Sequence, residues 1–358
     1  MFDCIIVGSG FAGAYLAGLL KNLDVLIIEK DKKALPKDSG IVSNKLYDFF
    51  KSFDDFVKEE IREMNAISPS GLQFSLKSEK PFAYVLDNGS LLEALRRKAR
   101  ENAKYQYETV KKINYFQNCV NVQTEQGSYD GRMVIGCDGA LSTVRKSLNI
   151  PSPKISAGIM CKAEIQSNVK IYFNKYFSPD FFSWVKNNEY GLVTAIRPAE
   201  YFEYFKKNLC LPEGDVTASP IPIGYTKSYA KRALLVGDAC GHVKPLTGGG
   251  IIFSMSAARH AAIVIKAALK TKRYDENFLK QYEGMWKKDF GHEIRLQLFL
   301  RKIYRNLTNK DVDSIFRDFG PHIERIEEFD YDKFTKIWTK LPRLKLLKFA
   351  ITKFPLAF

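Results

Sequence analysis

Hydrophobic positions near the start of the chain form two short, continuous apolar runs. The first, from Cys4 to Val7, predicts a buried parallel strand. A glycine-rich stretch, residues 8–13, follows it and opens a small-residue helix from Ala14 to Lys21. The second run predicts another buried strand, which ends on Glu29. The order strand, glycine turn, helix, strand predicts a βαβ unit at the N-terminus.

The glycines of this turn have the spacing of a dinucleotide-binding fingerprint. Gly8 permits the tight turn, Gly10 lets the backbone approach a pyrophosphate, and Gly13 allows close packing of helix and strand. The helix N-terminus offers unpaired N–H groups to phosphates. Glu29 follows about twenty residues later, where it can accept hydrogen bonds from a ribose. We therefore expect a dinucleotide here, and this motif alone leaves NAD and FAD open.

Further along the chain, the hydrophobic pattern predicts alternating helices and strands. Aromatic residues at helical spacing predict a helix over 44–64, and a basic amphipathic pattern predicts another over 90–103. Residues 150–225 are rich in aromatic and β-branched side chains and predict a sheet. The remaining predicted elements are strands at 72–76, 81–86, 105–111, 119–124, 133–138 and 233–238 and helices at 251–270 and within 274–352.

Two later strands have the same pattern as the first, a buried strand followed by a turn and a helix. In each of them the turn contains an aspartate. The first ends at Asp138-Gly139 and the second at Gly237-Asp238. Ligands of parallel sheets bind at the carboxyl ends of strands, so the three turns should converge on one long cofactor. The alternative is that both aspartates only cap helices. Three converging strand ends favour FAD over NAD.

Composition limits the class of protein and its partners. The 358 residues are enough for two intertwined domains, or for one domain plus an extension, and their 46% hydrophobic content is ordinary for a soluble globular protein. The unusual feature is the net charge of +15. After Asp332 there are seven Lys/Arg and no acid, mixed with apolar residues. This pattern favours an anionic membrane surface over nucleic acid, for which we find no binding module. A basic protein without a special partner is the alternative.

Cysteine usage and the chain start predict a cytoplasmic protein. The six cysteines form no Cys-x-x-Cys pair, so we expect reduced thiols, no disulfides and no metal site. The first strand begins within two residues of Met1, which leaves no room for a signal peptide. No uninterrupted apolar run reaches the ~18 residues needed to cross a bilayer.

The three strand-end motifs together resemble the flavoprotein hydroxylase superfamily. Within it, the string from Gly237 to Ile251, GDACGHVKPLTGGGI, resembles the geranylgeranyl reductase family, including the digeranylgeranylglycerophospholipid reductases. The resemblance covers roughly residues 1–270. It implies an α/β fold with a Rossmann-like FAD-binding domain (1–65, 85–149 and 226–270), a β-sheet substrate domain (66–84 and 150–225) and a C-terminal helical region (271–358).

The resemblance also implies which residues contact the cofactor. Val110 would contact the adenine through its backbone, at the end of its strand. The other expected FAD contacts are Gly8, Gly10, Ala12, Gly13, Glu29, Gly40, Ile41, Asp138, Gly139, Asp238, Gly248, Gly249, Gly250 and Ile251.

This chain departs from the family pattern at the catalytic loop and near the helix at position 90. Where lipid reductases often carry Cys-Gly after the second strand, it has Ser39-Gly40, and where an Arg is usual it has Asn88. Ser39 and His242 are the candidate catalytic residues, and His242 could equally be a structural histidine. Phe182 and Trp184 keep the aromatic-x-Trp core of the family's substrate motif. They line an isoprenoid tunnel or belong to an ordinary sheet core.

The implied activity is FAD-dependent saturation of isolated C=C bonds in geranylgeranyl or other isoprenoid chains of membrane lipids or their precursors. The alternatives are a flavin monooxygenase with the same FAD motifs and a non-catalytic prenyl-binding protein. The electron donor is expected to be NAD(P)H or a ferredoxin-like protein. The basic C-terminus predicts peripheral binding at the cytoplasmic face of the membrane.

Overall fold

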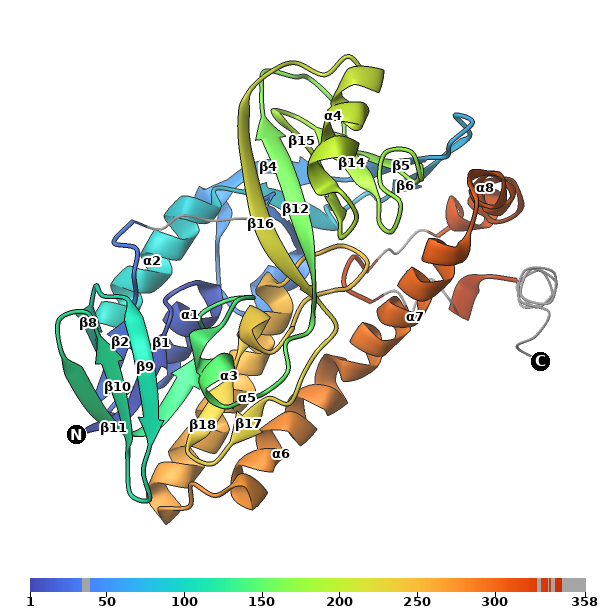
Figure 1. The fold of residues 1–358 in the computed structure, drawn as a ribbon. Coiled ribbons are helices and arrows are strands. Elements are labelled where there is room, and N and C mark those ends of the chain that lie inside the picture. Colours follow the sequence, from blue (N-terminus) through green and yellow to red (C-terminus); the bar gives the residue numbers. More distant parts are fainter. Residues whose placement is uncertain (34–38, 327–329, 334, 336–338, 343–358) are drawn as a thin grey trace. The chain divides into compact units, whose positions relative to one another are not determined.

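The computed structural model describes residues 1–33, 39–326, 330–333, 335 and 339–342, which divide into two compact units. Unit 1 comprises Met1–Lys58, Val85–Ser156 and Pro220–Leu298. Unit 2 comprises Glu59–Tyr84, Ala157–Ser219 and the described residues from Phe299 onward. The predicted C-terminal helical region, 271–358, contains the helices α6 (Glu276–Trp286), α7 (His292–Asn306) and α8 (Asn309–Ile323) (Figure 1). The division between the two units falls within α7, after Leu298.

Unit 1 is built on a mainly parallel sheet. In the described chain it has eight strands, and its central path runs β17-β18-β11-β1-β2-β8. All neighbours from β18 to β8 are parallel, and β17 is antiparallel to β18. The central strands are apolar on both faces because helices cover both sides of such a sheet. The path comprises β17 (Tyr229–Ala230), β18 (Ala233–Leu235), β11 (Ser128–Gly136), β1 (Phe2–Val7), β2 (Val25–Ile28) and β8 (Ala103–Gln106).

Small-residue helices pack closely in unit 1. Helix α1 (Phe11–Leu19) contacts both α2 (Asn88–Arg100) and α5 (Ile251–Thr271). By length and composition α5 could cross a membrane, but 61% of its most apolar window is buried inside the protein. It then leads into α6 (Glu276–Trp286), which it contacts. The pattern is that of a core helix, so it gives little support for a membrane span.

A hairpin extends the sheet of unit 1. Strands β9 (Val110–Tyr115) and β10 (Val120–Thr124) pair antiparallel, and β10 pairs with the first half of β11. The predicted strand 105–111 is therefore two strands, and Val110 begins β9 rather than ending a strand. The chain turns at Glu108, whose amide donates to the Glu29 carbonyl (3.0 Å) while its carboxylate accepts from the Tyr129 hydroxyl (2.8 Å).

The predicted helix over 44–64 is wrong. Only two short 3₁₀ turns form there, at Asn44–Asp48 and Asp54–Phe56, before β4 (Val57–Ile61) and β5 (Glu63–Ile67). The phenylalanines have helical spacing in the sequence, but their positions serve a tertiary contact instead. Phe49 and Phe50 both pack on the Tyr15 ring of α1. In β4 and β5 exposure alternates along the strand, as expected for a sheet with one buried face.

Unit 2 centres on a second sheet, which has seven strands in the described residues. All the neighbouring pairs with a known register are antiparallel except β13 and β5, which are parallel. The predicted strand at 72–76 is present in this sheet as β6. The predicted strand at 81–86 is present as β7 (Ala83–Leu86), which belongs to a separate three-stranded sheet and lies there between β3 (Ile41–Ser43) and β4. The seven strands in order are β16 (Asp215–Ile223), β12 (Lys154–Lys162), β15 (Glu189–Thr194), β14 (Ser183–Lys186), β13 (Lys170–Tyr172), β5 and β6 (Gln73–Lys77).

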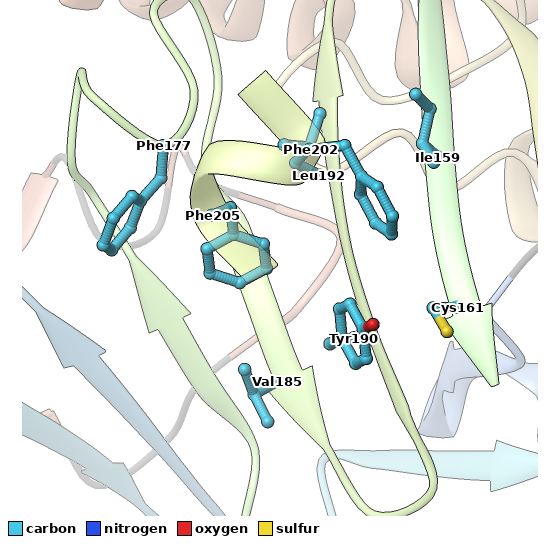
Figure 2. Packing of buried hydrophobic residues seen from close by; sticks show 8 residues of the cluster. All are labelled: Ile159, Cys161, Phe177, Val185, Tyr190, Leu192, Phe202 and Phe205. Carbon is cyan, nitrogen blue, oxygen red and sulfur yellow. The ribbon is translucent and has the colours of Figure 1, made fainter. Parts of the chain in front are cut away.

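One face of this second sheet carries an aromatic core under helix α4 (Pro198–Asn208). Figure 2 shows Phe202 and Phe205 of α4 pointing to the side chains of the strands. Phe202 stacks on Tyr190 with ring centroids 5.7 Å apart, and the Tyr190 hydroxyl donates to the Pro212 carbonyl (2.7 Å). Helix α8 (Asn309–Ile323) packs against β6, where Phe316 contacts Phe74.

Candidate functional site

The first two motifs meet in unit 1 because β1 and β11 are parallel neighbours. Gly8 has a φ of +94°, and a Cβ there would lie 2.9 Å from the Asp138 Cα. A Cβ on Gly13 would overlap the Gly8 carbonyl. Only glycine fits at both positions, so α1 can approach the strand ends closely. The fingerprint turn therefore lies directly against the turn that follows β11.

The third motif lies at the same edge of the sheet as the first two. A Cβ on Gly237 would lie 3.0 Å from the Ala12 side chain, and a Cβ on Gly250 would lie 3.1 Å from Asp238 Oδ1. The strand ends of β1, β11 and β18 thus bring the predicted residues of all three motifs together.

Two glycines at this edge border open space. A Cβ on Gly10 or on Gly139 would meet no heavy atom within 4 Å. Gly10 is also the N-terminal flanking residue of α1, and no side chain of the described chain caps that end. Space beside the backbone, together with uncapped N–H groups, suits a pyrophosphate. These residues therefore fit a phosphorylated dinucleotide.

Glu29 lies in a buried network that the sequence did not reveal. Its Oε2 accepts from the Ser9 amide (2.6 Å) and its Oε1 accepts from the Asp31 amide (3.0 Å). Arg96 of α2 lies 3.4 Å from the Glu29 carboxylate and donates to the Ser9 carbonyl (2.8 Å). Only 4% and 9% of the Arg96 and Glu29 side chains are exposed. Arg96 therefore holds the fingerprint turn and the acid at the end of β2 together.

Asp138 makes the contacts expected of a helix cap. Its carboxylate accepts from the Ser142 hydroxyl (2.6 Å) and from the amides of Thr143 (2.6 Å) and Val144 (3.1 Å), which begin α3 (Thr143–Ser147). Burial raises the pKa of Asp138, and these hydrogen bonds oppose that rise. The capping role considered from the sequence is thus present in the structure.

Arg145 joins the second and third motifs. This buried guanidinium donates to the Ala239 carbonyl after β18 (2.8 Å) and to the Ala140 carbonyl after β11 (2.8 Å). The two acidic turns are thereby held at a fixed separation. The sequence placed Arg145 in the second motif but gave no role for its side chain.

The loop before α5 contains the remaining predicted cofactor residues. It is tight, since the Gly248 amide donates to the Lys244 carbonyl (2.9 Å) and the Lys244 amide to the Gly249 carbonyl (3.0 Å). Gly250 precedes the first residue of α5, Ile251, and no side chain of the described chain caps this end. The open N–H groups of a 21-residue helix therefore face the loop.

His242 lies in the interior of unit 1 and makes a hydrogen bond typical of a structural histidine. It is fully buried, and its Nδ1 accepts from the Gly237 amide (3.1 Å), so the proton of the neutral ring lies on Nε2. Burial, with a smaller repulsion from His260, lowers the pKa of His242 to about 3. Such a ring is neutral at neutral pH, which argues against its role as proton donor.

The C-terminal helices form an aromatic wall behind this loop. His242 packs on Trp286, with ring centroids 4.7 Å apart, and on Phe290 (5.5 Å). Phe290 lies in a π-helical turn, Lys287–Gly291, between α6 and α7 (His292–Asn306), and stacks on Phe253 of α5 (4.6 Å). The sequence gave no motif for this wall, because its signal is aromatic spacing alone.

The candidates of the loop after β2 are Ser39 and its neighbour Gly40. Ser39 is partly buried and directly follows the undescribed residues 34–38. A Cβ on Gly40 would lie 2.9 Å from the Leu86 carbonyl and 3.6 Å from Asn88 Nδ2. Asn88 therefore lies beside Gly40. Ile41 begins β3.

The substrate candidates lie in unit 2, on the face of the sheet opposite α4. Trp184 pairs with Gly191 and Ile171 in neighbouring strands, whereas its neighbour Val185 belongs to the α4 core. A Cβ on Gly191 would lie 2.8 Å from Trp184 Cη2, so the indole lies over the glycine. Its Nε1 donates to Glu189 Oε1 (3.1 Å). Phe182 contacts the Trp184 ring edge to face (6.4 Å).

Trp184 is part of an apolar row across this face of the sheet. Paired residues on adjacent strands share a face. The row consists of Met160, Gly191, Trp184, Ile171, Ala66 and Phe74. The Ala66 and Phe74 end is covered by α8.

Residues 1–33, 39–326 and the few described positions beyond them contain no cluster of His, Cys, Asp or Glu that could hold a metal ion. The six cysteines are free thiols. The predicted membrane segment from Lys333 onward lies mostly outside the described residues.

No family model matches the chain. Curated relatives do match it over almost the whole length. Proteins named digeranylgeranylglycerophospholipid reductase from Methanococcus vannielii and Methanocaldococcus jannaschii are 28% and 27% identical, and each match covers 96% of both chains. The resemblance to the geranylgeranyl reductase family is confirmed by these matches.

Solved structures share the fold. A geranylgeranyl bacteriochlorophyll reductase-like protein from Thermoplasma acidophilum superimposes with a TM-score of 0.84 at 19% identity, covering 99% of this chain and 97% of that one. The halogenase PltM, solved in complex with FAD, gives a TM-score of 0.70 at 13% identity, covering 98% and 92%. The predicted fold, a Rossmann-like α/β unit with a β-sheet unit, is confirmed.

The buried Arg96–Glu29 pair generates the first prediction. Arg96→Met leaves the Glu29 carboxylate buried without its cation, so the free energy of unfolding should fall by about 3–5 kcal/mol. Urea unfolding measures this loss. Arg97→Met, at the exposed neighbouring position, is the matched control and should change stability by roughly 0.5 kcal/mol or less. Equal stabilities of the two variants would contradict a stabilising role for the Arg96–Glu29 pair.

The lowered pKa of His242 predicts a dependence of stability on pH. Its folded pKa is about 3 and its usual value is 6.5, so the unfolded chain binds the proton more readily between these values. Stability contributed by the neutral ring is complete above pH 6.5 and falls by about 1.4 kcal/mol per unit as pH decreases towards 3. Urea unfolding at several pH values should show a shallower slope for His242→Gln. His292→Gln, at an exposed histidine, should keep the wild-type slope.

Proposed function

We propose that this chain, a relative of the digeranylgeranylglycerophospholipid reductases, is an FAD-dependent oxidoreductase that saturates isolated C=C bonds in isoprenoid chains of membrane lipids or their precursors. The observation that carries the proposal is the convergence of three strand ends with the loop before α5 at one edge of the unit 1 sheet. An edge with three such strand ends favours FAD, which is bound along its length by several turns, over NAD bound at a single fingerprint.

The residues of unit 1 would hold FAD from end to end. Glu29 would accept from the adenosine ribose, since Arg96 and the Ser9 amide fix its carboxylate. The amides of the fingerprint turn beside Gly10 would bind the pyrophosphate, and the uncapped start of α5 would lie at the flavin end. When bound and reduced by its electron donor, the flavin would supply the hydride for one alkene carbon.

The apolar row of unit 2 would hold the hydrocarbon. Each buried CH₂ contributes ~0.8 kcal/mol, so a long prenyl chain gains affinity from an apolar surface alone. Trp184 is suited to this because its hydrogen bond to Glu189 and the absence of a side chain at Gly191 fix the indole plane. The proton for the second alkene carbon must come from a group other than neutral His242, and Ser39 remains a candidate.

We also propose a peripheral location at the cytoplasmic face of the membrane, with NAD(P)H or a ferredoxin-like protein as electron donor. The seven Lys/Arg residues after Asp332, with no acid among them, support attraction to anionic lipids. Helix α5 does not supply an anchor in this proposal, because it is a core helix of unit 1.

The reaction is tested under anaerobic conditions. Protein loaded with FAD is reduced with dithionite and mixed with a digeranylgeranyl lipid. We expect reoxidation of the flavin without oxygen and a product mass gain of ~2 per double bond from added hydrogen. Reoxidation that requires oxygen, with a hydroxylated product, would instead establish the monooxygenase alternative. Colourless protein that binds prenyl lipid but no flavin would establish the non-catalytic alternative.

Trp184→Ala tests the hydrocarbon row separately from the flavin. Loss of about 2–3 kcal/mol of apolar contact should lower kcat/KM for the prenyl lipid roughly 30- to 150-fold. The visible spectrum and the affinity for FAD should remain those of the wild type, because Trp184 lies in unit 2. Tyr204→Ala, at a half-exposed aromatic of α4, is the matched control. An unchanged kcat/KM for Trp184→Ala would place the hydrocarbon elsewhere.

A further inference from the structure

Gln297 of α7 lies against the loop that precedes α5. Its side chain is fully buried, and its Oε1 accepts from the Leu246 amide (3.3 Å). Because a backbone N–H can only donate, this contact fixes which end of the carboxamide faces Leu246. The Nε2 group must therefore point away from that amide, with two hydrogens to donate.

Two buried polar atoms beside this loop have no hydrogen-bond partner in the described part of the chain. They are Gln297 Nε2 and Oγ1 of Thr247, the residue after Leu246. Buried polar groups in native proteins are nearly always paired, since an unpaired one retains its desolvation cost. Both atoms belong to residues at the Leu246 segment of the loop, so one acceptor brought by a ligand there could satisfy them.

Helix α6, which precedes α7 in the chain, is held in the core of unit 1 by buried hydrogen bonds. The Tyr282 hydroxyl donates to the Leu235 carbonyl (3.0 Å), and Trp286 Nε1 donates to the Ser228 hydroxyl (3.0 Å). The π-helical turn follows, and α7 then places Glu293 and Gln297 one turn apart, both fully buried. Gln297 is thus presented to the loop by a helix whose start is held in the core of unit 1.

We propose that Gln297 Nε2, together with Thr247 Oγ1, donates hydrogen bonds to a carbonyl oxygen of the flavin's pyrimidine ring. The inference rests on the proposed function only in taking FAD as the cofactor. The loop leads directly into Gly249, Gly250 and the uncapped start of α5, which is the flavin end of the site. Negative charge builds up on this ring when the flavin is reduced, and fixed donors aimed at developing charge stabilise it without reorganisation.

The test compares Gln297→Leu, Gln297→Glu and Thr247→Val with Gln281→Leu, a control at an exposed glutamine of α6. FAD is titrated into each apoprotein, and the two-electron midpoint potential is measured by dye equilibration. For Gln297→Leu we expect about tenfold weaker binding of oxidised FAD and a further tenfold loss for the reduced form. That second factor lowers the potential by about 30 mV. Gln297→Glu should lower it more, because it adds a negative charge, and Gln281→Leu should match the wild type.

Unchanged affinity and potential in folded Gln297→Leu would overturn the proposal, because water would then satisfy the carboxamide. Weaker binding at an unchanged potential would also overturn it, since Gln297 would then only position the loop. If Gln297→Leu does not fold, Thr247→Val carries the same expectation of a lowered potential. Wild-type protein that binds FAD but leaves prenyl lipids unreduced would defeat the proposed function and leave these measurements valid.

Discussion

The close approach of α1 to the strand ends is the constraint on which unit 1 depends. Gly8 and Gly13 have no room for a side chain, because the turn after β11 and the backbone of the first turn occupy that space. In the sheet, β1 lies between β2 and β11, and β18 lies beside β11. The three acidic or glycine turns are then neighbours because parallel strands end at the same edge.

Buried cations hold this edge together. Arg96 connects the fingerprint turn to the end of β2, and Arg145 connects the turn after β11 to the turn after β18. Both act mainly through donation to backbone carbonyls, which fixes the backbone and leaves it facing the open space beside Gly10 and Gly139. The shape of this edge, the proposed cofactor site, thus depends on two side chains outside the motif glycines.

The sequence predicted the elements and the convergence of motifs well where the signal is local. Glycine spacing, buried strands and strand-end aspartates are set by neighbours in the chain, so they could be recognised. The region 44–64 failed because its phenylalanines pack on Tyr15, a tertiary contact that imitates helical spacing. Arg96, Gln297 and the aromatic wall were missed because each acts on residues far away in sequence, and a basic or amide residue in a helix is ordinary.

The π-helical turn at Lys287–Gly291 sets the rotational phase of the helix that follows. Each residue of an α-helix advances about 100° around the axis, so one residue more or fewer in this turn would carry Gln297 away from Leu246. A change of length before Phe290 would also move this ring, which lies in the turn and stacks on Trp286. The turn therefore couples the packing of the aromatic wall to the position of Gln297. The C-terminal helices consequently constrain the site through their register, which no local sequence motif records.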